Sequence, residues 1–230
     1  MIRLLVLLLA SLPGWGAIAF VNGSAAAGAT MGAISVTGGN MLVACAVYQG
    51  GGASVTVSDT AGNTYVSLTP QLRGTDSAYG VWCHYSLNVT GAASNVVVFA
   101  GPSVFEGAVV QYSGVATSSA LDVTGVGAAG NSNTATTASF TTSTANQLIL
   151  SATPAELWGI TSFTIGGVAA NSRVTSPSGT ITIADRIVSS IQSGIAAVAT
   201  NSSAQKWAIL AFSFKEAAAG GGRRRITLIQ

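Results

Sequence analysis

The sequence predicts an all-β protein, an antiparallel β-sandwich of jelly-roll type with two pseudo-repeated halves. Short runs alternate apolar and polar residues, and turn residues recur about every eight to twelve positions. No segment keeps a helical period over three turns. The 230 residues are 49% hydrophobic and 7% charged, which is ample for a core and unlike a disordered chain.

The expected strands fall into two sets separated by Gly, Asn and Asp turns. The first set covers residues 17–22, 31–37, 41–48, 53–59, 63–68, 79–88, 95–100 and 105–113. The second set covers residues 120–125, 135–141, 147–153, 160–168, 180–188, 194–199 and 206–214. Strands this short and evenly spaced favour a sandwich over a parallel sheet with crossover helices.

A weak internal repeat relates the two sets. Thr37–Val43 resembles Ser143–Ile149, and Gly107–Tyr112 resembles Ala208–Ser213. Each half begins with a Ser/Thr/Ala-rich strand, turns at an Asn and closes on an apolar strand. We therefore expect repeated sheet units or half-barrels within one sandwich domain, residues 20–215.

Residues 1–19 have the pattern of an export signal. Arg3 precedes the apolar run Leu4–Ala10, and Ala17–Ala19 forms an A-x-A cleavage site. The run is shorter than the roughly 20 residues that cross a bilayer, so we expect no transmembrane span. The alternative is an uncleaved apolar arm or a first strand.

Residues 216–230 are expected to form a Gly-rich linker with a basic and apolar tail. The tail is either disordered or a docking peptide whose apolar residues extend a partner's sheet while its arginines meet acidic groups. The docking residues would be Arg223, Arg224, Arg225, Ile226, Leu228 and Ile229. The net charge of +2 gives no general attraction to nucleic acid, so we expect no specific nucleic-acid partner.

The two cysteines lie in separate β-like runs. Cys45 falls within Leu42–Tyr48 and Cys83 within Tyr79–Val89. On neighbouring strands in an oxidising compartment they would form a disulfide, and as small apolar side chains they would equally suit buried free thiols. Their spacing excludes a CxxC metal or redox motif.

Catalytic groups are scarce in this chain. It has seven carboxylates and one histidine, and neither GxSxG nor HExxH occurs. No two carboxylates form a motif that would pair them for glycoside hydrolysis. We therefore expect no catalytic residue and no cofactor, and a hydrolase is the least favoured function.

Two ligand motifs are also considered. Gly125–Gly130 matches GxGxxG, but no helix follows to hold a pyrophosphate. Asp59 begins the turn Asp59–Tyr65, where it would accept hydrogen bonds within a hairpin that joins two strands, with Gly62 and Asn63 tolerating positive φ. A calcium loop would need more than this one carboxylate, so we expect no metal site.

Aromatic residues are the better candidates for ligand binding, because sugar rings stack on exposed aromatic faces. The candidates are Tyr48, Trp82, His84 and Trp158, with Trp158 the most exposed because it follows a turn signal. Core packing is the competing interpretation for at least two aromatic residues, and Trp207 is expected in the core. On a strand, Trp82 and His84 share one face, and His84 is interpreted as an ordinary surface or interface histidine.

An ordered series of segments resembles a family of poorly characterised β-sandwich domains from secreted or cell-surface bacterial proteins and phage virions. The segments are Ala19–Val21, Gly39–Val43, Val57–Tyr65, Tyr85–Gly91, Gln111–Val115, Thr144–Leu148 and Ala184–Ser190. The resemblance implies a jelly-roll-like fold and a structural or surface-binding role, and it carries over no catalytic residue.

The leading hypothesis is a non-enzymatic structural or adhesive module of an exported bacterial protein or a phage virion. It would self-associate or attach to another surface or virion protein. Few charges would have to be desolvated in such packing. The alternative is a carbohydrate-binding module that uses exposed aromatic residues on a glycan.

Overall fold

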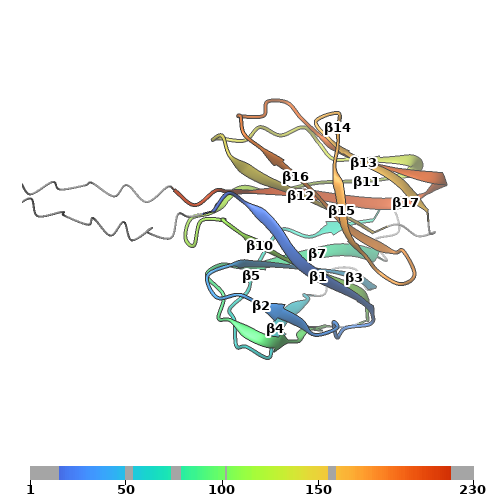
Figure 1. Ribbon diagram of the computed structural model, residues 1–230. Helices are drawn as coiled ribbons and strands as arrows, with labels where there is room; N and C mark the ends of the chain where they lie inside the picture. Colours follow the sequence, from blue (N-terminus) through green and yellow to red (C-terminus); the bar gives the residue numbers. More distant parts are fainter. Residues whose placement is uncertain (1–15, 50–53, 74–78, 102, 155–158, 219–230) are drawn as a thin grey trace, which may run out of the picture.

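The computed structural model describes residues 16–49, 54–73, 79–101, 103–154 and 159–218. These residues form antiparallel strands and no helix, which confirms the predicted all-β class (Figure 1). The strands are β1 (Ala19–Ala27), β2 (Ile34–Val36), β3 (Met41–Gln49), β4 (Thr56–Asp59), β5 (Val66–Ser67), β6 (Gln71–Leu72), β7 (Tyr79–Ser86), β8 (Ala92–Asn95), β9 (Val97–Ala100), β10 (Val104–Ser113), β11 (Leu121–Thr136), β12 (Gln147–Pro154), β13 (Ile160–Ile165), β14 (Val168–Ala169), β15 (Asn171–Thr175), β16 (Ile181–Val188) and β17 (Ala197–Lys215).

The strands form two stacked halves with one strand order. In the N-terminal half, β1 to β10, the main sheet runs β1-β10-β3-β7-β5. In the C-terminal half, β11 to β17, the corresponding order is β11-β17-β12-β16-β15. The second layers also correspond, because β4 pairs with β9 while β13 pairs with the first part of β17. The expected two-half organisation is present in this strand order, and the jelly-roll assignment stays a prediction.

The internal repeat in the sequence identifies matching strands, but its register is one residue out. Leu42 of β3 packs in the core of the N-terminal half, whereas Leu148, its match in β12, packs between the halves. Val109 and its match Leu210 differ in the same way. Because successive strand residues face opposite sides, a shift of one residue exchanges the two faces.

Three apolar cores lie between four layers of strands. The central core joins the halves and includes Val43, Val110, Leu150, Ile183 and Phe212. The outer cores lie within the N-terminal half, around Leu42 and Phe99, and within the C-terminal half, around Ile149 and Phe163. Both main sheets are thus buried on both faces, which explains uninterrupted apolar strands such as β3.

Strand β11 is longer than the sequence predicts, since the expected strands at 120–125 and 135–141 leave a gap that β11 spans. It pairs with β17 over almost its whole length. A Cβ atom at Gly130 would lie 2.6 Å from Cζ2 of Trp207, and one at Gly127 would collide with the Gln71 side chain. These two glycines therefore admit neighbouring side chains close to the strand, and no helix follows them to hold a phosphate.

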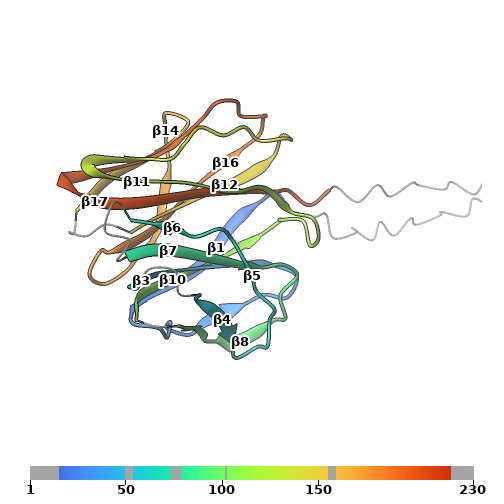
Figure 2. The ribbon, with the colours of Figure 1, turned by 180° about the vertical axis from the view of Figure 1, so that it is seen from behind.

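The described chain ends lie at the same end of the molecule (Figure 2). The N–H of Ala217 donates to the carbonyl of Gly114, 2.8 Å away, on the segment that joins the halves. A Cβ atom at Gly114 would lie 2.6 Å from the carbonyl oxygen of Ala17, so only glycine fits between the two ends. Ile18 packs in the central core and Ala19 begins β1, so a cut after Ala19 would remove both from the fold.

A disulfide joins Cys45 and Cys83, which decides between the two interpretations of the cysteines. The residues are direct partners on β3 and β7, with Cα atoms 4.0 Å apart. Both side chains are fully buried in the central core. The bond therefore staples the main sheet of the N-terminal half at the face that meets the C-terminal half.

Replacing both cysteines, Cys45→Ala and Cys83→Ala, should lower the free energy of unfolding by about 2–4 kcal/mol, since the bond closes a long loop in the unfolded chain. Urea unfolding of the oxidised protein and the double variant measures the difference. The wild type unfolded with a thiol reductant should show a similar loss, and a loss below about 1 kcal/mol would contradict the stapling role.

Candidate functional site

Three of the aromatic residues singled out in the sequence lie together inside the N-terminal half. The ring centroids of Tyr48 and Trp82 are 5.6 Å apart, and the Trp82 and His84 rings stack at 6.1 Å. Nε1 of Trp82 donates to Oγ of Ser67 at 2.6 Å. Trp82 and His84 share one face of β7, as expected, and this face turns toward the core of their own half.

Burial leaves these residues little surface for stacking on a glycan. Tyr48 is 1% and His84 3% exposed, so His84 is not the surface or interface histidine that the sequence suggested. Burial also lowers the pKa of His84, although a hydrogen bond to the backbone of Val55 partly offsets the shift. Trp82 alone of the three keeps a partly exposed ring. Trp158 and the docking residues Arg223–Ile229 lie outside the described residues.

Asp59 organises a turn, as the sequence predicts. Its carboxylate accepts from the backbone N–H and side-chain Nδ2 of Asn63, at 2.9 and 2.7 Å, and from the Tyr65 hydroxyl at 2.9 Å. Burial alone would raise the pKa of Asp59, but these bonds and one from Asn95 hold it below its usual value. The expected hairpin does not form, because β4 pairs with β9 and β5 pairs with β7.

Two polar contacts, here called the inter-half clamp, fix β10 to the hairpin of β15 and β16. At one end, the Tyr112 hydroxyl donates to Oδ2 of Asp185 at 2.6 Å. Asp185 is fully buried and also accepts from Nε of Arg173 at 2.8 Å and Nδ2 of Asn171 at 3.2 Å. The Arg173 guanidinium in turn lies 4.7 Å from the ring centroid of Phe20 on β1.

The other end of the inter-half clamp is the Glu106 carboxylate. It is 2% exposed and accepts from the hydroxyl groups of Ser176 and Ser178, in the turn between β15 and β16. The Ser176 hydroxyl also accepts the backbone N–H of Ile181 at 3.0 Å. Since Glu106 and Tyr112 point from the same face of β10, the clamp encloses the small apolar residues between them.

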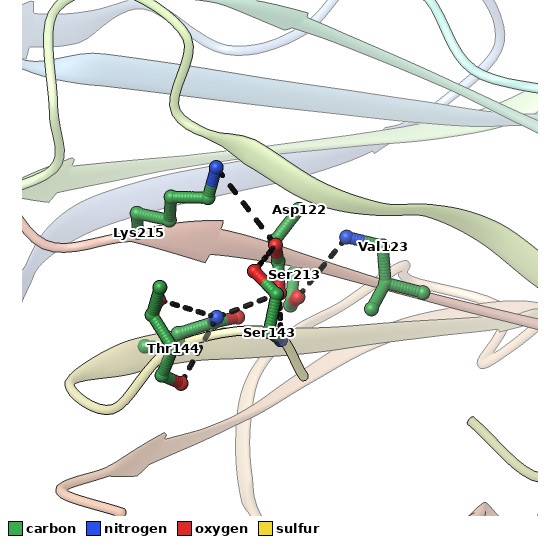
Figure 3. A network of polar contacts seen from close by, with 7 residues as sticks. Asp122, Val123, Ser143, Thr144, Ser213 and Lys215 are labelled. Carbon is green, nitrogen blue, oxygen red and sulfur yellow. Dashed lines mark hydrogen bonds and ion pairs between the residues drawn. The ribbon is translucent and has the colours of Figure 1, made fainter. Parts of the chain in front are cut away.

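A fourth carboxylate, that of Asp122, gathers a network of polar contacts beside the last residue of β17, Lys215 (Figure 3). Asp122 on β11 accepts from the backbone N–H of Ser143 at 2.7 Å and from Nε2 of Gln147 at 2.7 Å. The Ser143 hydroxyl donates to the other carboxylate oxygen, Oδ1 of Asp122. Nζ of Lys215 lies 3.8 Å from the same Oδ1 atom. Burial would raise the pKa of Asp122, but these donors and the lysine charge keep it below its usual value.

These four carboxylates each hold two or more segments of the fold together. Asp59, Glu106, Asp122 and Asp185 all accept hydrogen bonds from residues distant in the sequence or across a turn. Within the described ranges, no three His, Cys, Asp or Glu residues gather closely enough to hold a metal ion. The described residues also include no helix long and apolar enough to cross a membrane. Through these hydrogen bonds the four carboxylates connect segments of the fold to one another.

A pocket of about 240 Å³ opens into the C-terminal half between β13 and the hairpin of β15 and β16. The described residues that line it are Gly159, Ile160, Ser172, Thr175, Gly179 and Thr182. Ser172 and Thr175 are exposed at its mouth, and Thr182 is buried. The sequence analysis missed this site because it predicts no strand at β15 and because single Ser and Thr residues carry no distinctive pattern.

The corresponding place in the N-terminal half is filled by aromatic side chains. Trp82 on β7 and Tyr48 on β3 face the core of that half, whereas Thr182 on β16 and Thr153 on β12 face the core of the C-terminal half. Since β7 and β16 occupy the same place in the strand order, the N-terminal half carries large rings on strands where the C-terminal half carries small hydroxyl side chains, which leave more space unfilled.

Tyr112→Phe should destabilise the protein by about 1.5–3 kcal/mol, because it removes a hydrogen bond to the buried Asp185 carboxylate. Tyr85→Phe is the matched control, since the Tyr85 hydroxyl has no such bond within the described residues, and its expected change is within about 0.5 kcal/mol. Urea unfolding measures both. A cycle that adds Asp185→Asn should show coupling with Tyr112→Phe, and additive effects would contradict a direct clamp.

Asp122→Asn should lower the free energy of unfolding at pH 7 by about 1–3 kcal/mol, because it removes the charged acceptor of three hydrogen bonds. A folded-state pKa below the unfolded value stabilises the fold above about pH 4, and this contribution is lost as pH falls through the folded-state pKa. The wild type and the variant should therefore converge in acid. Unfolding measured across this pH range tests the prediction, and a constant difference would contradict it.

No protein-family model matches the chain, and no curated protein or solved structure matches it either. The resemblance to β-sandwich domains of surface and virion proteins therefore stays a prediction. The case for a function rests on the placement of the described residues, on the shared strand order of the halves and on the pocket in one of them.

Proposed function

We propose that this chain is a non-enzymatic structural or adhesive surface module that works by self-association or attachment to another surface protein. The observation that carries the proposal is the meeting of both described chain ends at Gly114. A body held from one end presents its opposite end and its flanks to a partner. The segments that resemble β-sandwich domains of exported and virion proteins support the same role and an extracellular or virion location.

The way polar groups are used supports this role. The two halves are joined by an apolar core and the inter-half clamp, and a buried disulfide braces the main sheet of the N-terminal half. Four of the seven carboxylates in the sequence accept hydrogen bonds that connect segments of the fold. A braced body with few free charges suits close packing against copies or a neighbouring surface.

The alternative expectation, glycan binding on exposed aromatic rings, receives less support from the described residues. Tyr48 and His84 are buried, and Trp82 donates to Ser67 while packing against both. An open stacking platform needs a ring face free of protein contacts.

Light scattering on the full chain tests the proposal. The expected mass is a multiple of 22.8 kDa, with association weakened when Arg223, Arg224 and Arg225 are replaced by alanine. An equal number of substitutions at exposed serines is the control for altered solubility. A strictly monomeric protein without affinity for cells, virions or glycans would overturn the proposal.

A further inference from the structure

A row of hydroxyl groups starts in the wall of the C-terminal pocket, where Thr175 and Thr182 are lining residues. Thr175 on β15 pairs with Thr182 on β16, which pairs with Thr153 on β12. Directly paired residues of an antiparallel sheet point to the same side, so the three hydroxyls form one threonine row. The side-chain oxygens of Thr175 and Thr182 are 3.1 Å apart. The row runs from the exposed mouth at Thr175 to the fully buried Thr153.

Four buried polar side-chain atoms of Thr153, Ser151 and Asn201 lack hydrogen-bond partners among the described residues. They are Oγ1 of Thr153, Oγ of Ser151, and both Nδ2 and Oδ1 of Asn201. Thr153 and Ser151 are fully buried, and Asn201 pairs with the lining residue Ile160. A buried polar group without a partner costs about 1–3 kcal/mol. Several such groups are therefore expensive for the fold alone, and a polar ligand that reached them would supply the missing partners.

The chemistry of the lining defines the ligand class. The described lining residues are two glycines, one isoleucine and three hydroxyl side chains, none of them charged. Hydroxyl and amide groups both donate and accept, so they match a ligand that does the same. At about 240 Å³ the pocket lies just below the roughly 300–1,000 Å³ of sites for drug-sized ligands. Its occupant is therefore small, neutral and rich in hydroxyls.

We infer that the C-terminal half binds one neutral sugar ring or a comparable polyol in this pocket, through the lining hydroxyls of Ser172, Thr175 and Thr182, and that the ligand also reaches the buried Thr153, Ser151 and Asn201 behind them. The exposed Ser172 and Thr175 admit the ligand, and Thr182 holds its inner edge. This site goes beyond the surface-module function and does not depend on it. It also differs from the aromatic platform expected from the sequence.

Titration calorimetry on the full chain tests the inference with glucose, galactose, mannose, N-acetylglucosamine and myo-inositol. Glucuronate and glucosamine are the charged counterparts. We expect one-to-one binding of at least one neutral compound, and charged counterparts that bind at least tenfold more weakly. Thr182→Val should weaken binding roughly tenfold, because it removes a hydroxyl of the row without changing the side-chain volume much.

Two further variants separate ligand binding from folding. Ser172→Trp, at an exposed position, should block the mouth and abolish binding without lowering the unfolding midpoint. Thr153→Val should keep or raise the stability of the ligand-free protein while weakening binding, because its hydroxyl has no partner within the described fold. Thr124→Val, at an exposed position of β11, is the control and should change neither property.

The outcomes are distinct from those of the surface-module proposal. Absence of binding by every neutral compound, equal binding of the charged counterparts, or binding unchanged by both Thr182→Val and Ser172→Trp would overturn the inference. The first of these outcomes would mean that water alone satisfies the hydroxyls. Light scattering on the same samples reports association independently, so an associating protein that binds no sugar would refute this site and leave the surface-module function standing.

Discussion

The fold depends on the contact between the two main sheets. Each sheet has an outer layer of its own, so the strands at the centre are buried on both faces and a polar side chain placed there costs free energy unless it finds a partner. Strand β10 satisfies this requirement with Glu106 near one end and Tyr112 near the other. Between them the contact is apolar, so the halves gain buried area while the polar groups fix their register.

A β-bulge in β15 makes one end of the inter-half clamp possible. The pairing with β16 shifts between Ser172 and Val174, so Asn171 and Arg173 both reach the Asp185 carboxylate. The same strand approaches β1 closely, where a Cβ atom at Gly23 would lie 2.8 Å from Cγ1 of Val174. The buried Asp185 is therefore tolerated because bulge and glycine together bring a cation and an amide to it.

The sequence alone predicts the all-β class, most strand positions and the turn at Asp59. Its internal repeat also identifies which strands of the two halves correspond to each other. The sequence misses the short strands β6, β8 and β15, whose two to five residues show little alternation. It also divides β17, because Asn201 and its serine neighbours resemble a turn, although pairing with β11 and β13 keeps the strand continuous. The pocket could not be predicted, since its hydroxyl groups come together only through the register of β12, β15 and β16.

The shared strand order gives the two halves the same space to fill, and they fill it differently. In the N-terminal half, Tyr48, Trp82 and His84 pack ring against ring, and the disulfide braces the reverse side of the same sheet. In the C-terminal half, the threonine row lies on the corresponding face of the main sheet. There the buried hydroxyls of Ser151 and Thr153 have no hydrogen-bond partner among the described residues and so do not stabilise the fold. The close packing of the N-terminal half can offset the free-energy cost of the unpartnered hydroxyls in the C-terminal half, because the central core and the inter-half clamp make the two halves unfold together. The half with the poorer packing is therefore the one in which a binding site is to be sought.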